Sequence, residues 1–221
     1  MRTCLTFLFV FLALTPFFAQ ESSFYFGANA AFQSSRIFCS TDSDAGGILE
    51  YGFTPKAAAG IDLVYSFNPR IAVHSGFIYS LQGQSYKTAE NANAQYKTEL
   101  NYFKIPVLLE WRSNAEKKYA FLLQGGFQLS LLNKAESSRD RVFYYYSPEV
   151  RDVNEYYNST NVDVVLATGL DVRVRSSHLR VLIRADLSLN DIEVTDKKQG
   201  LRAPAGNMTL AIPQLSYLIK L

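Results

Sequence analysis

Two histidines, His74 and His178, are the side chains of this sequence best suited to acid–base chemistry. A serine nucleophile needs an adjacent base, usually a histidine, which a carboxylate holds in orientation. His74 could form such a triad with Asp62 and Ser80, and the triad would hydrolyse or transfer an acyl group. The alternative is an internal histidine that fills space and hydrogen-bonds a carboxylate. We favour this alternative and predict no catalytic residue and no enzyme activity; His178 falls in a predicted turn.

Neither the acidic residues nor the cysteines have the spacing of a metal or cofactor site. Asp42 and Asp44 flank a serine, as at the start of a calcium loop, but the spaced ligands that complete such a loop do not follow. Of the two cysteines, Cys4 lies in the N-terminal apolar segment, which leaves Cys39 without an internal disulfide partner. We therefore predict no metal site and no cofactor.

The N-terminal residues have the composition of a secretory signal peptide. Arg2 supplies a positive charge, and an apolar run over residues 5–14 ends a few residues before Ala19. We predict a signal peptide over residues 1–19 and one mature domain over residues 20–221. An N-terminal membrane anchor is the alternative, although the apolar run is short for a helical span.

Beyond this segment, apolar and polar residues alternate with a period of two, which is the pattern of β-strands. Short links follow the second, fourth and sixth predicted strands, and long links follow the others. Short turns at one end and long loops at the other are typical of an outer-membrane β-barrel, with the turns in the periplasm and the loops outside the cell. Seven of the eight predicted strands cover residues 24–33, 57–66, 71–82, 102–111, 121–131, 162–174 and 179–190, and the last strand ends with the alternating residues 215–221. The long links cover residues 34–53, 83–96, 132–160 and 191–206.

The two faces of the predicted strands differ in charge and in size. One face carries no charged residue, although 19% of the chain is charged, and lipid contact explains this because a charge near the bilayer midplane costs roughly 2–4 kcal/mol. The other face combines small residues with acids and bases in similar numbers, which suits a narrow lumen where buried charges must pair. The predicted lumen charge network consists of Asp62, His74, Lys104, Glu110, Asp163, Asp171, Arg173, Arg180, Arg184 and Asp186.

These patterns predict an all-β fold, an eight-stranded antiparallel up-and-down transmembrane β-barrel that is monomeric in the outer membrane. A soluble periplasmic calyx with its apolar face inward would show the same alternation and is the alternative. The net charge of +2, without a Lys/Arg run, argues against nucleic acid as a partner. The partners that we expect are outer-membrane lipid and a protein that the sequence does not identify.

The third long link is rich in tyrosine and arginine, which recur at recognition surfaces. One interpretation is a loop that recognises a partner outside the cell. The other is that the tyrosines fold back and cover the mouth of the barrel. The candidate recognition residues are Tyr144, Tyr145, Tyr146, Tyr156 and Tyr157.

Two segments resemble the PorT-like outer-membrane β-barrel family of Bacteroidota-type bacteria. Residues 100–111 are similar to the family's fourth-strand segment, with Tyr102, the pair Ile105-Pro106 and an aliphatic run, and residues 75–83 resemble the preceding strand. The alternating chain end, from Tyr217 to Leu221, fits as well. The resemblance implies an outer-membrane barrel and carries no catalytic residues. The namesake of the family is associated with protein secretion across the outer membrane.

The function that we expect is structural or interactive: a barrel with a filled lumen whose extracellular loops meet a partner. A small pore is one alternative, but long lumen side chains such as Arg180 and Arg184 would obstruct it. A barrel enzyme that modifies lipid is a further alternative, and it depends on the triad described above.

Overall fold

The computed structural model describes most of the chain beyond the predicted signal peptide, which lies outside the described residues. The described ranges contain β-strands and two short 3-10 helices, η2 (Asn154–Tyr156) and η3 (Thr195–Lys197). Within these ranges, no helix is long and apolar enough to cross a membrane. The ranges are residues 22–40, 49–52, 54–88, 95–113, 117–139, 149–198 and 202–221.

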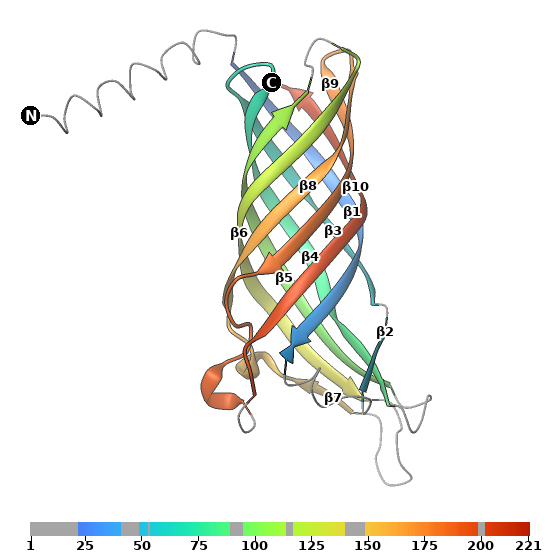
Figure 1. Cartoon of the computed structure of the whole chain (residues 1–221), viewed down its shortest axis with the longest axis vertical. Coiled ribbons are helices and arrows are strands. Elements are labelled where there is room, and N and C mark those ends of the chain that lie inside the picture. Colours follow the sequence, from blue (N-terminus) through green and yellow to red (C-terminus); the bar gives the residue numbers. More distant parts are fainter. Residues whose placement is uncertain are drawn as a thin grey trace, which may run out of the picture.

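Eight strands of the described chain form a closed antiparallel barrel, whose strands are tilted against its vertical axis in Figure 1. Each barrel strand pairs with the next one along the chain, and β1 pairs with β10, which closes the sheet. The predicted fold class is therefore confirmed. The barrel strands are β1 (Ser23–Cys39), β3 (Pro55–Ser66), β4 (Ile71–Thr88), β5 (Gln95–Arg112), β6 (Tyr119–Arg139), β8 (Thr160–Val174), β9 (Ser177–Ser188) and β10 (Ala205–Lys220).

The two ends of the barrel differ in the length of their links. At the short-turn end, which is uppermost in Figure 1, lie the C-terminus and the links β3–β4, β5–β6 and β8–β9. The β3–β4 turn forms because Asn68 Oδ1 accepts hydrogen bonds from the backbone N–H groups of Arg70 and Ile71, each at 2.8 Å. The opposite end, the long-loop end, carries two added strands, β2 (Leu49–Gly52) beside β4 and β7 (Glu149–Asp152) beside β6.

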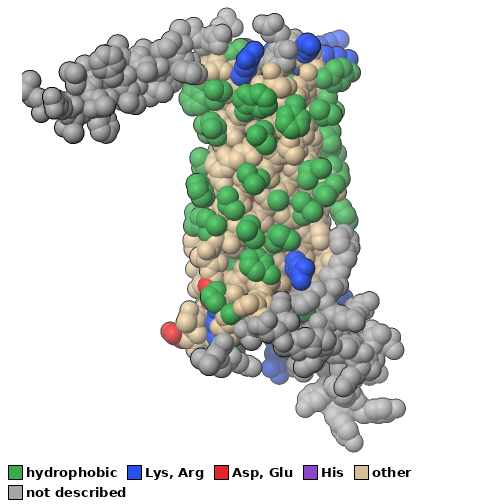
Figure 2. Space-filling model, in the orientation of Figure 1, with side chains coloured by type: hydrophobic (Ala, Val, Ile, Leu, Met, Phe, Trp, Pro, Cys, Tyr) green, Lys and Arg blue, Asp and Glu red, His purple; other side chains and the backbone are tan. Residues whose placement is uncertain are grey.

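The strand alternation places apolar side chains outside and polar side chains in the lumen. In β9, for example, Val181 and Ile183 are exposed, whereas Arg180 and Arg184 are buried. Figure 2 shows hydrophobic side chains over the height of the wall, and charged ones gathered mainly at the ends. A barrel in lipid requires such an apolar outer surface. A soluble calyx would instead have its apolar face inside and its polar face outside.

Several strands are longer than the sequence pattern predicts. β1 continues to Cys39, β4 to Thr88 and β6 to Arg139, so part of each predicted long link is in fact strand. The outward residues of the β6 extension include Lys134 and Glu136, which form an ion pair at 2.8 Å, although Phe38 on the β1 extension is apolar and exposed. Backbone pairing thus continues beyond the part of the wall that is apolar outside, and hydropathy no longer predicts a strand there.

Glycines on the lumen face allow neighbouring strands to approach closely. A Cβ on Gly126 would lie 2.3 Å from the carbonyl oxygen of Val107, and one on Gly169 would lie 2.1 Å from that of Val181. Only glycine fits at such distances from the next backbone. These glycines therefore fix the curvature of the wall, beyond leaving room for larger lumen side chains.

Candidate functional site

A buried carboxylate on β5, Glu110, is the centre of the charged lumen. Arg180 donates two hydrogen bonds to it, from Nη1 to Oε2 at 3.0 Å and from Nη2 to Oε1 at 2.8 Å. Arg112 Nε donates to Oε1 at 2.8 Å, and Gln124 Nε2 donates to Oε2 at 2.9 Å. All four side chains are buried, so this is a paired charge cluster without access to bulk water.

His74 lies next to this cluster and has polar partners on both ring nitrogens. Its Nε2 is 3.1 Å from Asp62 Oδ1, and its Nδ1 is 3.0 Å from the amide nitrogen of Gln124. Glu110 Oε2 also lies 3.8 Å from Nδ1, so the ring has an acidic side chain on each side. Asn29 also donates to Asp62, at 2.6 Å. The histidine therefore links two carboxylate clusters.

The triad conceivable from the sequence is not assembled. Ser80 and His74 are six residues apart on β4, which separates them by about 20 Å along the strand. Ser80 Oγ instead accepts hydrogen bonds from Gln33 Nε2 at 2.9 Å and Gln82 Nε2 at 3.1 Å. The favoured interpretation, a space-filling histidine on a carboxylate, is the geometry that the structure has.

A second charged layer lies nearer the long-loop end, around Asp186 and Asp163. Asp186 accepts from Lys104 Nζ at 2.7 Å and from Arg184 Nε at 2.8 Å. Asp163 accepts from Gln128 Nε2 at 2.9 Å, and serine hydroxyls donate to both of its oxygens. This layer contains as many basic as acidic side chains, so its charges cancel locally.

At the short-turn end the structure corrects two sequence-based placements and adds one residue to the lumen. Arg173 is exposed, because it lies where β8 ends and the lumen opens, and it therefore leaves the predicted network. Arg112, one residue beyond the predicted strand, lies inside and 5.9 Å from the ring centroid of Tyr25. His178 is not in a turn: it is buried on β9, where its Nδ1 is 2.8 Å from Asp171 Oδ1.

The described side chains leave little free space in the lumen. One internal cavity lies beside the second charged layer, with Lys104, Arg184, Asp186, Asn29 and Gln33 among its lining residues. This cavity is large enough for about one water molecule. The nine network residues other than Arg173 are all buried, so they fill the lumen.

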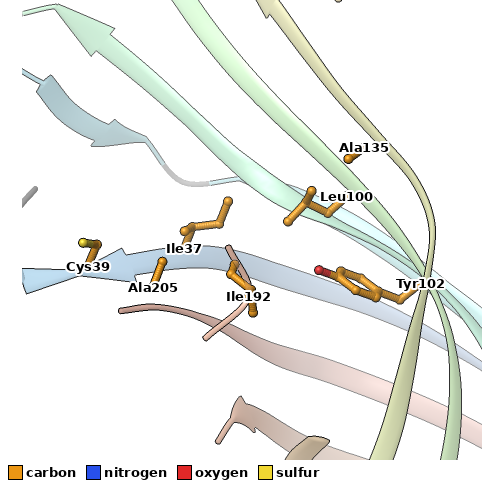
Figure 3. Packing of buried hydrophobic residues seen from close by; sticks show 7 residues of the cluster. All are labelled: Ile37, Cys39, Leu100, Tyr102, Ala135, Ile192 and Ala205. Carbon is orange, nitrogen blue, oxygen red and sulfur yellow. The ribbon is translucent and has the colours of Figure 1, made fainter. Parts of the chain in front are cut away.

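An apolar cluster closes the long-loop end of the lumen, and we call it the cap. Ile192, from the link between β9 and β10, is fully buried in it, with an exposed fraction of 0%. Val153 and Tyr157 pack against it from the link between β7 and β8. Figure 3 shows the buried members between the strand ends. They are Ile37, Cys39, Leu100, Tyr102, Ala135, Ile192 and Ala205.

Asp191 holds the cap in place through backbone and side-chain contacts. Its Oδ1 accepts the backbone N–H groups of Ala205 at 3.0 Å and Glu193 at 3.1 Å, and Lys198 donates to its Oδ2. Partial burial raises the pKa of the Asp191 carboxyl, but these donors outweigh it and hold that pKa below its usual value. The carboxylate is thus built into the cap as a charged acceptor.

The candidate recognition tyrosines divide into three groups. Tyr144, Tyr145 and Tyr146 lie outside the described residues. Tyr157 packs against the cap, as in the cap interpretation. Tyr156 is 44% exposed on η2, with Lys197 Nζ 5.8 Å from its ring centroid, so it is available for contact with a partner.

Among the described residues, no cluster of three or more His, Cys, Asp or Glu side chains has the arrangement of a metal site. Cys39 has a free thiol, buried in the cap.

Comparisons with known proteins place the chain among membrane barrels. A family model described as "Outer membrane protein beta-barrel domain" matches residues 18–193. A search of the curated proteins gave no match.

Solved barrel structures are similar in fold at low identity. Neisserial surface protein A is 14% identical, with a TM-score of 0.47 over 91% of this chain and 100% of that chain. Outer membrane protein OprG from Pseudomonas aeruginosa is 11% identical, with a TM-score of 0.41 over 91% of this chain and 95% of that chain. Outer membrane protease OmpT from Escherichia coli is 8% identical, with a TM-score of 0.44 over 90% of this chain and 97% of that chain.

Proposed function

Because this chain belongs to the family of outer membrane protein β-barrel domains, we propose that it is a closed, non-enzymatic barrel that binds a partner at its long-loop end. The protein lies in the outer membrane. By the layout of this class, the short-turn end faces the periplasm and the long-loop end faces the outside of the cell.

The observation that supports a closed barrel is the filled lumen. An ion would have to pass the Glu110 cluster, the layer around Asp186 and the cap. The two charged layers are buried and internally paired, and the cap is buried and apolar. An eight-stranded barrel has an interior just wide enough for side chains. The small-pore alternative would require these contacts to open together.

The long-loop end offers the surface for a partner. β6 and β7 continue the sheet beyond the barrel wall, where Val150 on β7 is 68% exposed and Tyr156 on η2, six residues later, is 44% exposed. Exposed aromatic and apolar groups on a rigid sheet are suited to binding a protein. The PorT-like resemblance suggests protein secretion across the outer membrane as the process in which such a partner takes part.

The non-enzymatic part of the proposal follows from the burial of the best candidate side chains. His74 is 1% exposed and already has two partners, so a substrate has no path to it in this geometry. The alternative of a lipid-modifying enzyme predicts that a His74→Ala variant loses an activity that the intact protein has.

Two measurements test the proposal. In planar bilayers, the purified protein should show no steady unitary openings, and regular openings would instead establish the pore. For binding, protein captured from detergent-solubilised outer membrane should lose its partner when Val150→Asp and Tyr156→Ala are combined. Tyr119→Leu, an exposed change at the opposite end, is the matched control. A partner retained by the double variant as well as by the control would contradict a binding surface on β7 and η2.

A further inference from the structure

The exposed acids and bases of the barrel are distributed unevenly between its two ends. The proposed function does not involve this distribution. Six exposed bases lie at the short-turn end, whereas the described acids of that end, such as Asp171 and Glu110, are buried in the lumen. The exposed acids of the described chain, such as Glu99, Asp152 and Glu155, lie at the long-loop end. Figure 2 shows Lys and Arg side chains at the upper, short-turn end. These six residues, the basic ring, are Arg70, Lys117, Lys118, Arg173, Arg175 and Lys220.

Each short link contributes to the basic ring, and the backbone brings its members together in pairs. Arg173 N–H donates to the carbonyl oxygen of Lys118 at 2.9 Å, so these two residues are neighbours across β6 and β8. Lys220 N–H donates to Ser176 at 3.3 Å, which places it beside the Arg175-Ser176 turn. Two adjacent cations are enough to hold one phosphate group between them.

The apolar surface continues up to the basic ring. Val174, next to Arg175, is 47% exposed, and Leu221, next to Lys220, is 74% exposed. Two exposed aromatic residues, Trp111 and Tyr119, lie at the same level, and Lys118 Nζ is 5.5 Å from the Tyr119 ring centroid. Aromatic side chains of this kind mark the bilayer interface. The basic ring therefore lies at the depth of the lipid headgroups and not far out in the periplasm.

We infer that the basic ring binds anionic phospholipid headgroups of the periplasmic leaflet. The partner carries phosphate charge at the same depth as the bases, and no exposed Asp or Glu side chain of the described short-turn end competes for them. Juxtamembrane bases attract anionic lipid by electrostatics that salt weakens. The ring would retain a shell of such lipid around the barrel and set how deeply the barrel lies in the bilayer.

Trp111 makes this inference testable, because it is the only tryptophan of the chain and lies among the ring residues. The N–H of its neighbour Arg112 donates to the carbonyl oxygen of Arg70 at 2.8 Å, and its own strand, β5, leads into the turn that holds Lys117 and Lys118. A brominated lipid quenches tryptophan fluorescence on contact. Quenching of Trp111 therefore reports which lipid occupies the wall next to the ring.

The experiment compares brominated phosphatidylglycerol with brominated phosphatidylcholine, at equal mole fractions in phosphatidylcholine vesicles that hold the folded protein. We expect the relative binding constant to favour phosphatidylglycerol by about fivefold or more, which is the attraction of one base near an anionic surface. High salt should lower this ratio toward one. An equal quenching by both lipids at low salt overturns the inference and leaves the ring as a contact for a soluble acidic partner.

Two triple variants separate the ring from general charge. Arg70→Gln, Lys117→Gln and Lys118→Gln together should bring the ratio close to one. The matched control removes three bases that have acidic partners away from the ring, Lys56→Gln, Lys134→Gln and Lys197→Gln, and should keep the wild-type ratio. If both triple variants lower the ratio equally, or if neither does, a headgroup site at the ring is wrong. Heat-dependent gel mobility verifies that each variant is folded.

Discussion

Arg180 on β9 reaches Glu110 on β5 with both terminal nitrogens, and the side chains of both residues have an exposed fraction of 0%. β6 and β8 lie between these strands in the sheet, so the pair joins two non-adjacent parts of the wall through the lumen. A bidentate pair fixes distance and orientation together. It therefore braces the barrel from inside as well as filling it.

The Glu110→Gln variant should be markedly less stable than the wild type. It leaves Arg180 and Arg112 without their shared carboxylate, and an uncompensated buried charge costs about 3–5 kcal/mol. The measurement is urea unfolding of the protein in lipid vesicles. A matched double variant, Glu110→Leu with Arg180→Leu, should recover most of the loss, because it removes the orphaned Arg180 charge as well. A single variant as stable as the wild type would show that the brace contributes nothing.

The sequence predicts the side of the wall on which these charges lie, but not their partners. Alternation assigns Glu110 and Arg180 to the lumen because a strand turns successive residues to opposite faces. The pairing across the lumen depends on strand tilt and barrel closure, which place distant strands opposite one another. Periodicity also fails near strand ends: Arg173 has lumen parity, yet it is exposed where the lumen opens.

Gly126→Ala should destabilise the barrel, whereas Gly125→Ala should not. A Cβ at the inward Gly126 would lie 2.3 Å from a backbone oxygen, while one at the outward Gly125 would meet only the end of the Leu166 side chain at 3.4 Å. Backbone cannot yield as a side chain can, so we expect a loss of about 1–3 kcal/mol for Gly126→Ala. Unfolding midpoints of the two variants, measured side by side, check this. Equal midpoints would mean that the wall adjusts to the added methyl group.

Strand length is the part of the fold that the sequence underestimates. Hydropathy locates β9 and the first part of β6, where one face contacts lipid, but not the end of β6 at Arg139. Beyond that part the outward face of β6 carries polar residues such as Lys134, and the inward face contributes the small Ala135 to the cap. The apolar face outward and polar face inward that mark a lipid-facing strand are therefore lost, although the backbone ladder continues. The sequence pattern does not predict the cap either, because Ile192 lies in a predicted long link, outside the strands whose alternation assigns residues to a face.

Asp191 should make the closure of the cap depend on pH. The lowered pKa of its carboxyl determines whether acid or base opens the cap. The contacts with Lys198 and the N–H groups of Glu193 and Ala205 favour the carboxylate. The carboxylate therefore stabilises the cap fully at a pH above the unfolded pKa of about 3.9. This stabilisation is lost as the pH falls through the lower pKa of the folded protein. The cap should stay closed at neutral pH and loosen in acid below pH 4.

Cys39 reports this closure, because its thiol is buried in the cap at an exposed fraction of 2% and its Sγ is 3.4 Å from the carbonyl oxygen of Ala203. Labelling by dithiodipyridine, which reacts in acid, gives a protection factor relative to the unfolded chain at each pH. We expect that factor to fall by about tenfold in acid, equivalent to one charge-assisted hydrogen bond of about 1.5 kcal/mol. Asp191→Asn should show the lower protection at every pH, since it cannot ionise. Protection that is independent of pH in the wild type, or unchanged in Asp191→Asn, would mean that apolar packing around Ile192 closes the cap without help from this carboxylate.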